Sequence, residues 1–241
     1  MKRWLTKAVV INVMAGLCLL TAANFVHSAK ADLNGDGKME TIVLEVVPDS
    51  SDFVLKVNHS SIKGSFSNGG GEPEDTDLMI VDIDRTDPYQ EIAVHNPGPS
   101  DDDEYLVYWY DGVTLKQMGD LARWPDFSGN GIVMVGNWMG FWTQKEKYVL
   151  DKKERMLKPV PQEFYYVGVE SEVKATFPLY RTKNGPEVVA NLKPQSKCLV
   201  LLFDASSSLP NEWYLIKSST GIVGWARYDS IFDKLVLPLA D

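Results

Sequence analysis

Short runs of β-branched and aromatic residues, separated by clusters of Gly, Asn, Asp and Pro, recur along most of the chain. Examples are TIVLEVV, DFVLKV and LMIVDI in the first half, and EFYYVGV, CLVLLF and EWYLIK in the second. Such runs are typical of strands, and no stretch after residue 31 keeps the apolar spacing near 3.6 residues that an amphipathic helix requires. Without helical crossovers, neighbouring strands pair antiparallel. The pattern predicts an all-β fold built from antiparallel meanders.

Composition excludes several classes of function. The 241 residues include 33 acidic and 24 basic side chains, a formal charge of −9. An acidic chain lacks the general attraction to phosphate on which nucleic-acid binding depends, so we expect no nucleic-acid partner. With two cysteines and three histidines, neither a disulfide framework nor a Cys-based zinc site can be built.

Residues 1–31 contain the three parts of a secretory signal peptide. Three basic residues precede an apolar run at residues 8–20, and the small residues Ala29 and Ala31 follow it. That run is shorter than the ~20 apolar residues that a membrane span needs, and an uncleaved N-terminal anchor is the alternative. A second cleavage point follows Ala23. The prediction is a secreted or cell-wall-associated protein with no membrane attachment after cleavage.

The acidic excess is confined to one part of the chain. Residues 32–165 carry 25 acids and 12 bases, whereas residues 166–241 carry eight of each. Such asymmetry favours two domains with separate roles, and the stiff Pro-Val-Pro segment at residues 159–161 is typical of a boundary region. We therefore predict an acidic β domain over residues 32–168 and a second domain over residues 169–241.

The sharpest local motif is DLNGDGKME at residues 32–40, which leads directly into the run TIVLEVV. Oxygen-bearing side chains stand at its positions 1, 3, 5 and 9, and Gly stands at position 6. Calcium takes six to eight oxygen ligands, and the sharp turn needs a residue that tolerates positive φ. The alternative is a hairpin turn with solvated acids. The expected ligands are Asp32, Asn34, Asp36, the Lys38 carbonyl and Glu40.

A looser copy, DIDRTDPYQE at residues 82–91, precedes the run IAV. It is one residue longer than the first loop and lacks the Gly at position 6. Two alternatives follow, a second calcium site and a plain turn. The candidate ligands are Asp82, Asp84, Thr86, Asp87 and Glu91.

The two loops, about fifty residues apart, resemble the calcium loops of FG-GAP or VCBS repeats, which occur in integrin-type propellers and secreted bacterial proteins. In that family a strand, not a helix, follows the loop, and the bound calcium is structural. The resemblance covers about residues 32–120. Because a full propeller needs at least four blades, we expect an FG-GAP-like sandwich or a partial propeller.

Residues 172–232 contain five short pieces, in the order LYR, VVANLKP, CLVLLF, WYLIK and GIVGWARY. As a set they resemble a bacterial SH3-type (SH3b) domain. The resemblance implies a small barrel of five short strands, and members of the family often attach secreted proteins to peptidoglycan or its peptide cross-links. As ligand-binding rings we select Tyr180, Trp225 and Tyr228.

Aromatic residues are dense between residues 105 and 142, where they fit either a sugar-binding platform or the core of a sheet. Alternation within EYLVYWY favours the core, because half of these side chains face inward. The aromatic residues concerned are Tyr105, Tyr108, Trp109, Tyr110, Trp124, Trp138, Phe141 and Trp142.

No catalytic motif is present: the chain has neither a Gly-x-Ser-x-Gly elbow nor a His-Glu-x-x-His sequence. The first hypothesis is a secreted, non-enzymatic calcium-binding protein whose SH3-like module binds peptidoglycan or a cell-surface glycan or peptide. One alternative is a secreted glycan or cell-wall hydrolase that uses the module for targeting. Another is an extracellular protein-interaction or inhibitor module.

Overall fold

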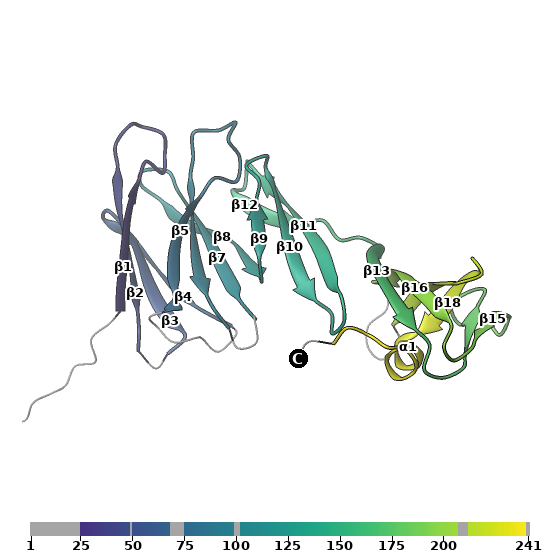
Figure 1. Ribbon diagram of the computed structural model, residues 1–241. Coiled ribbons are helices and arrows are strands. Elements are labelled where there is room, and N and C mark those ends of the chain that lie inside the picture. Colours follow the sequence, from purple (N-terminus) through teal and green to yellow (C-terminus); the bar gives the residue numbers. More distant parts are fainter. Residues whose placement is uncertain (1–24, 49, 68–74, 99–101, 207–211, 240–241) are drawn as a thin grey trace, which may run out of the picture.

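The computed structural model describes residues 25–48, 50–67, 75–98, 102–206 and 212–239 (Figure 1). Eighteen strands and one short helix account for the regular structure of these residues. The strands form four sheets, and every pairing within them is antiparallel. The prediction of an all-β fold built from antiparallel meanders is confirmed.

The first three sheets are four-stranded meanders. The first has the order β1-β2-β3-β4, with β1 (Phe25–Ala31), β2 (Glu40–Val46), β3 (Asp52–Val57) and β4 (Ser60–Ser65). The second has the order β5-β6-β7-β8, with β5 (Asp77–Val81), β6 (Glu91–Asn96), β7 (Glu104–Tyr110) and β8 (Leu115–Ala122). The third has the order β12-β11-β10-β9, with β9 (Pro125–Phe127), β10 (Ile132–Trp138), β11 (Thr143–Asp151) and β12 (Met156–Pro159).

These three sheets lie side by side as an open stack (Figure 1). One apolar core lies between the first two sheets, where Leu44 and Leu55 belong to the same buried cluster as Val94 and Tyr108. A second core lies between the second and third sheets and includes Val107, Met118, Val133 and Leu150. Burial on alternate residues of β2 and β3 follows from the two-residue period of a strand, which places successive side chains on opposite faces.

Strand β1 corrects the predicted start of the first domain. It pairs along its whole length with β2, from Phe25 opposite Val46 to Ala31 opposite Glu40. The first sheet therefore includes residues 25–31, which lie before the predicted start at Asp32. Removal of residues 1–31 would delete an edge strand, whereas cleavage after Ala23 would leave the sheet intact. The apolar run of residues 8–20 lies outside the described residues.

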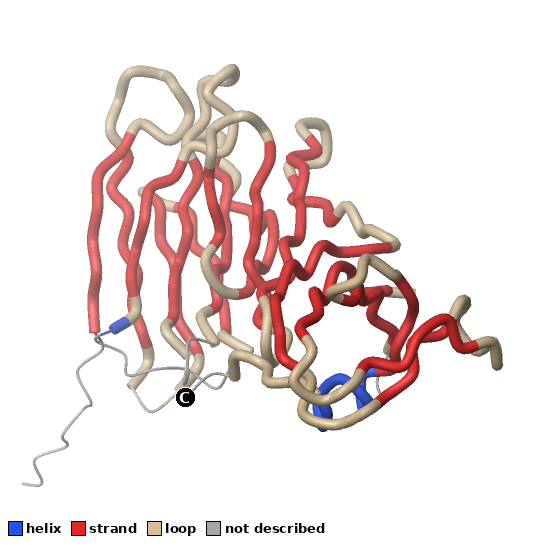
Figure 2. Tube along the Cα trace, turned by 45° about the vertical axis from the view of Figure 1, so that its right-hand side comes forward, coloured by secondary structure: helices blue, strands red, loops and turns tan. Residues whose placement is uncertain are grey.

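The fourth sheet has six strands in the order β13-β16-β17-β18-β14-β15. Its two edge strands, β13 and β15, do not pair with each other, so the expected closed barrel is not formed. Figure 2 shows the sheet curving round its own core, and register shifts occur in β13, β14 and β16. Its elements are β13 (Phe164–Glu172), β14 (Phe177–Tyr180), β15 (Val188–Leu192), β16 (Lys197–Asp204), β17 (Trp213–Ser218), β18 (Val223–Arg227) and α1 (Tyr228–Lys234).

The predicted boundary at residues 168 and 169 falls inside β13. The Pro-containing segment does mark the end of the third sheet, because β12 ends at Pro159, but the fourth sheet starts at Phe164. The two parts also share a core. Phe141 and Trp142, from the turn between β10 and β11, belong to the buried cluster of the fourth sheet.

Candidate functional site

The loop between β1 and β2 winds its oxygen-bearing side chains round its own backbone. The Asp32 carboxylate accepts hydrogen bonds from the N–H groups of Asp36 (3.1 Å) and Gly37 (2.8 Å). Asn34 Oδ1 accepts from the same Asp36 N–H at 3.0 Å. Asp36 Oδ1 accepts from the Lys38 N–H at 2.8 Å, and this bond holds the pKa of Asp36 below its usual range. A φ of +84° at Gly37 accounts for the glycine at position 6.

A buried glutamate closes each of the two acidic loops in the same way. Glu40, 4% exposed, is the first residue of β2, and its Oε2 accepts from the Leu33 N–H at 2.8 Å. Glu91, 1% exposed, is the first residue of β6, and its Oε2 accepts from the Ile83 N–H at 3.0 Å. The internal repeat inferred from the sequence is therefore a structural repeat.

The same loops join each sheet to the next. The Leu33 carbonyl accepts a hydrogen bond from Gln90 N–H at 3.1 Å, and the Ile83 carbonyl accepts one from Gly131 N–H at 2.7 Å. Gln90 and Gly131 directly precede the first residues of β6 and β10. The Gly-Asn-Gly turn ending at Gly131 therefore follows the two acidic loops as a third linking segment. The sequence did not lead us to select it. Its sequence signal is DFSGNG at residues 126–131, which has the Asp and both Gly residues of DLNGDG at the same positions and precedes a strand-like run.

In the second loop, cations from the turn between β11 and β12 neutralise two of the expected metal ligands. Lys152 Nζ lies 2.5 Å from Asp84 Oδ2 and 3.1 Å from Thr86 Oγ1. Arg155 lies 2.9 Å from Asp87 Oδ2. The hydrogen bond from Lys152, together with those from Thr86, lowers the pKa of Asp84 to about 2. Protein cations therefore lie where the calcium hypothesis needs free carboxylates.

Arg155 is also fixed by two aromatic rings. Its guanidinium lies 4.3 Å from the ring centroid of Tyr89 and 5.3 Å from that of Trp109. Its side chain is only 17% exposed. A guanidinium held over aromatic faces and paired with a carboxylate is a rigid contact, and it fastens the third sheet to the second.

Beneath this ion-pair cluster lies a carboxyl group with an unusual environment. Burial raises the pKa of Glu91 to about 7, and the neighbouring charges of Asp87 and Asp82 add to the effect. Glu91 Oε1 and Asp82 Oδ1 are buried without a hydrogen-bond partner among the described residues. A proton or a cation at this point would satisfy them. Among the same residues, no group of three or more His, Cys, Asp or Glu side chains is arranged to hold a metal ion.

The fourth sheet presents aromatic side chains on its solvent-facing side. Tyr180 and Trp225 lie directly opposite each other on β14 and β18. Since cross-strand partners share a face, the register extends this pair into a row across five strands. The row consists of Tyr166, Leu202, Leu215, Trp225 and Tyr180.

A second row runs two residues further along the strands, on the same face because the strand period is two. Phe164 is 37% exposed, and in the first row Tyr166 is 70% exposed. We call the two rows together the aromatic face. The residues of the second row are Phe164, Asp204, Trp213 and Arg227.

Of the three rings selected from the sequence, the structure brings together two. Tyr180 packs edge-on against Trp213 at a centroid distance of 6.3 Å, and Trp225 lies 6.1 Å from Phe164. Tyr228 instead begins α1, where its ring lies 5.5 Å from that of Phe232. Tyr228 therefore does not join the other two rings, because it packs against the core cluster on the other side of the sheet. Period-two alternation in EFYYVGV and EWYLIK is the signal that would have found Phe164 and Trp213.

A lysine lies over the aromatic face. Lys183, from the loop between β14 and β15, places Nζ 2.5 Å from Asp204 Oδ2. The same Nζ lies 5.3 Å from the ring centroid of Trp225 and 5.7 Å from that of Phe164. Burial alone would raise the pKa of Asp204, but hydrogen bonds from Lys183 and Ser206 outweigh burial and hold that pKa below its usual range.

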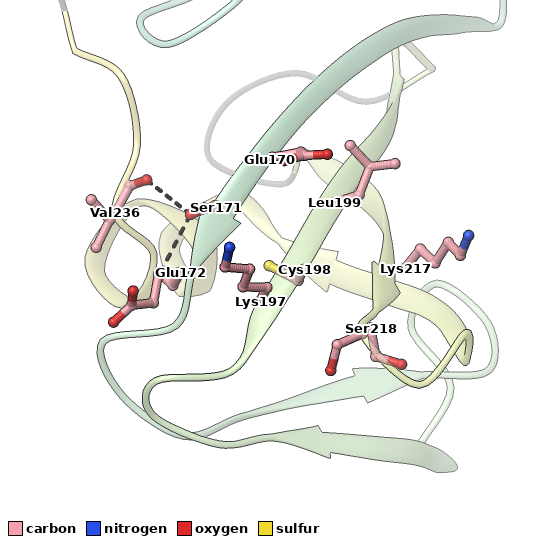
Figure 3. Close-up of a pocket in the computed structure, with 10 residues that line it drawn as sticks. Glu170, Ser171, Glu172, Lys197, Cys198, Leu199, Lys217, Ser218 and Val236 are labelled. Atoms are coloured by element: carbon pink, nitrogen blue, oxygen red, sulfur yellow. Dashed lines mark hydrogen bonds between the residues drawn. The ribbon is translucent and has the colours of Figure 1, made fainter.

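An open cavity of about 520 Å³ lies near the other end of the same sheet (Figure 3). Charged side chains of both signs line it, together with the buried Cys198, whose thiol has its pKa raised to about 11 by burial. The Ser171 hydroxyl donates to the Val236 carbonyl at 2.9 Å (Figure 3). The charged lining residues are Glu170, Glu172, Lys197 and Lys217.

A smaller cavity, about 210 Å³, lies on the second sheet and is mainly acidic. Glu104 and Asp120 both line it, and burial followed by the charge of Glu104 raises the pKa of Asp120. Paired carboxylates with different affinities for a proton are the groups that a glycan hydrolase needs. This cavity is the place where the alternative enzymatic hypothesis can be examined.

Most of the aromatic residues between positions 105 and 142 belong to cores and not to a sugar-binding platform. Trp124, 53% exposed, and the half-buried Trp138 belong to none of the core clusters. Neither stacks with another ring among the described residues. The buried members are Tyr105, Tyr108, Tyr110, Phe141 and Trp142.

Within the described part of the chain, no helix has the length and apolar character needed to cross a bilayer. Comparison of the chain with family models, with curated proteins and with solved structures found no match.

Proposed function

We propose that this chain is a non-enzymatic binding protein, in which the three stacked sheets are a scaffold and the aromatic face of the fourth sheet is the binding surface. The observation that carries the proposal is the register of exposed and half-buried rings. Tyr166, Trp225 and Tyr180 align across the sheet, with Phe164 beside them. Ligand sites combine such aromatic surface with a few fixed polar groups, here Asp204 and Arg227.

The ligand class follows from the resemblance of residues 172–232 to bacterial SH3-type domains. On that basis the partner is peptidoglycan or a cell-surface glycan or peptide. Export by a signal sequence ending at Ala23 would place the protein outside the cell, where it would meet that partner. The sequence from Phe25 onward would then form the complete first sheet.

Calcium is proposed as a structural ion of the first loop only. Asp32, Asn34 and Asp36 direct oxygens toward the same short stretch of backbone, and each oxygen keeps a lone pair beyond its hydrogen bond. The cation near them, Lys38, has an 83% exposed side chain and is free to move away. In the second loop, Lys152 and Arg155 already neutralise the carboxylates.

The proposal is tested by sedimentation of the purified chain with insoluble cell wall. Trp225→Ala and Tyr166→Ala should each weaken wall binding about fivefold to thirtyfold, because truncation of an aromatic ring in a binding surface costs about 1–2 kcal/mol. Phe232→Ala is the matched control, since this exposed ring lies on α1 and away from the aromatic face. Equal loss in all three variants, or no binding by the parent chain, would contradict the proposal.

The same sedimentation experiment also distinguishes the proposed binding role from the enzymatic alternative. Release of soluble wall fragments that continues with time, and that Asp120→Asn abolishes, would favour a hydrolase with a site at the acidic cavity. Binding without fragment release favours the proposed role. Binding of a protein partner with no binding to wall would favour an interaction or inhibitor module.

A further inference from the structure

The position of the Lys183 ammonium is chemically specific. Its Nζ lies 2.5 Å from the carboxylate of Asp204, which is 1% exposed, and within 5.7 Å of the centroids of two aromatic rings, Phe164 and Trp225. A cation over aromatic faces beside a buried carboxylate is the arrangement by which proteins recognise ammonium groups. A planar guanidinium pairs best with both oxygens of a carboxylate. Asp204 Oδ1 already accepts hydrogen bonds from Ser206 N–H and Oγ, so the site suits an ammonium better than a guanidinium.

The group that fills this position comes from a loop. Lys183 stands in the turn from Thr182 to Gly185, whose backbone is fixed by the Gly185 N–H bond to the Thr182 carbonyl at 3.3 Å. The lysine side chain remains 30% exposed. Rotation about its side-chain bonds would therefore free the carboxylate and the rings without breaking a strand pairing.

We infer that Asp204, Phe164 and Trp225 form a receptor for an alkylammonium group, and that Lys183 fills it until an amine of the ligand replaces it. The inference rests on the proposed binding role of the aromatic face and names one chemical feature of its ligand. That feature is a primary amine on a flexible alkyl chain, as in a lysine-like side chain of a surface peptide. Lys183 is then an internal competitor that lowers the apparent affinity.

The inference is tested by whether Lys183→Ala strengthens or weakens the binding of an alkylammonium ligand. Nα-acetyl-lysine amide is titrated into the full chain and into Lys183→Ala, with tryptophan fluorescence and calorimetry as readouts. If Lys183 occupies the receptor about nine-tenths of the time, its removal strengthens binding about tenfold. A purely structural lysine predicts equal or weaker binding, and that result would overturn the inference.

Three controls accompany the titration. Nα-acetyl-norleucine amide has a similar shape without the charge and should not bind. Adding Asp204→Asn to Lys183→Ala should abolish the gain, because the carboxylate is lost. Lys193→Ala removes an exposed lysine elsewhere on the domain and should bind like the parent chain.

If Lys183→Ala is too unstable for titration, its melting temperature is measured with added n-propylammonium chloride, which replaces the deleted atoms. The salt should raise that melting temperature, and it should not raise that of the double variant with Asp204→Asn. Equal responses of the two variants would contradict the inference.

The inference and the proposed function can fail separately. Wall binding that depends on Trp225, without any gain in amine affinity, would contradict only the inference. A gain in amine affinity without wall binding would leave the receptor standing and contradict the proposed function.

Discussion

The indole Nε1 of Trp142 donates a hydrogen bond to the phenolic oxygen of Tyr214 at 3.4 Å, across 72 residues of sequence. Trp142 belongs to the turn between β10 and β11, whereas Tyr214 belongs to β17 in the fourth sheet. Phe141, beside it in the turn, lies 5.6 Å from the Tyr214 ring, and Trp142 lies 5.6 Å from Phe203. The β10–β11 hairpin of the third sheet therefore supplies part of the core of the fourth sheet.

Trp142→Ala should destabilise the fourth sheet strongly. Removal of a fully buried Trp leaves a cavity and typically costs about 3–5 kcal/mol. Urea denaturation, followed by near-ultraviolet circular dichroism, measures the loss. Trp124→Ala, at a 53% exposed position, is the control and should change the free energy of unfolding by less than about 1 kcal/mol. Similar losses in the two variants would mean that the turn does not support the core.

Folding of residues 164–241 in isolation is a related measurement. A fragment of these residues retains all strands of the fourth sheet but lacks Phe141 and Trp142. We expect it to unfold at a lower denaturant concentration than the same sheet in the full chain. A fragment beginning at residue 169, the predicted start of the second domain, would also lose the first part of β13.

Glu91 should make the first domain less stable as the pH rises. Its ordinary pKa is 4.5, and burial raises the value to about 7 in the folded chain. Between these pH values the unfolded chain has released the proton and the folded chain has not, so stability falls from pH 4.5 to 7 and stays low above it. Glu91→Gln should be more stable by about 2–3 kcal/mol at pH 8, as measured by urea denaturation in the presence of a chelator. The difference should disappear near pH 4, where both states of the parent chain are protonated. A constant difference at all pH values would contradict this account.

Calcium should raise the melting temperature of the chain through the first loop. At a free calcium concentration one hundred times the dissociation constant, binding adds about 2.7 kcal/mol, which corresponds to about 5–10 °C for a protein of this size. Calorimetry with calcium and with chelator measures the shift. Asp36→Ala should remove most of it, because Asp36 carries an exposed ligand oxygen and contacts no core strand. Asp87→Ala is the comparison in the second loop and should leave the calcium response intact.

Arg155 should stabilise the packing of the third sheet against the second through its contacts with Asp87, Tyr89 and Trp109. Arg155→Ala removes an ion pair with Asp87 and two ring contacts, a loss of about 1–3 kcal/mol. Arg155→Lys should recover only part of it, since an ammonium does not stack as a guanidinium does. Lys153→Ala, in the same turn but exposed, is the control for both variants in thermal melts. Full recovery by lysine would show that charge alone matters.

Cys198 should be unreactive in the folded chain. It is 5% exposed, and burial raises the pKa of its thiol to about 11, so little thiolate exists at neutral pH. In a chain of residues 24–241, which lacks Cys18, labelling with a chromogenic disulfide reagent at pH 8 should proceed at the rate of opening of the fourth sheet and should become fast in denaturant. Fast labelling without denaturant would contradict the buried position.

Local sequence determined the strands and the turns. Period-two alternation and the turn residues between runs predicted an all-β chain, and the Asp-x-Asn-Gly-Asp-Gly spacing predicted a tight loop. The hydrogen bonds that Asp32 accepts from N–H groups of that loop were not predicted, and only the structure shows them. The repeat of that loop before a second strand was also visible, because Glu40 and Glu91 occupy the same place relative to the following apolar run.

Tertiary structure decided which distant groups meet. Lys152 and Arg155 contact the second loop from a turn more than sixty residues later. Trp142, from the third sheet, packs in the core of the fourth. Trp225 lies beside Phe164, whereas Tyr228 lies beside Tyr214. Such encounters depend on how sheets stack and curve, which is set by the packing of whole faces and not by the residues of one strand. Charge and side-chain type are written in the sequence, but the partner of a charge is fixed only when the chain has folded.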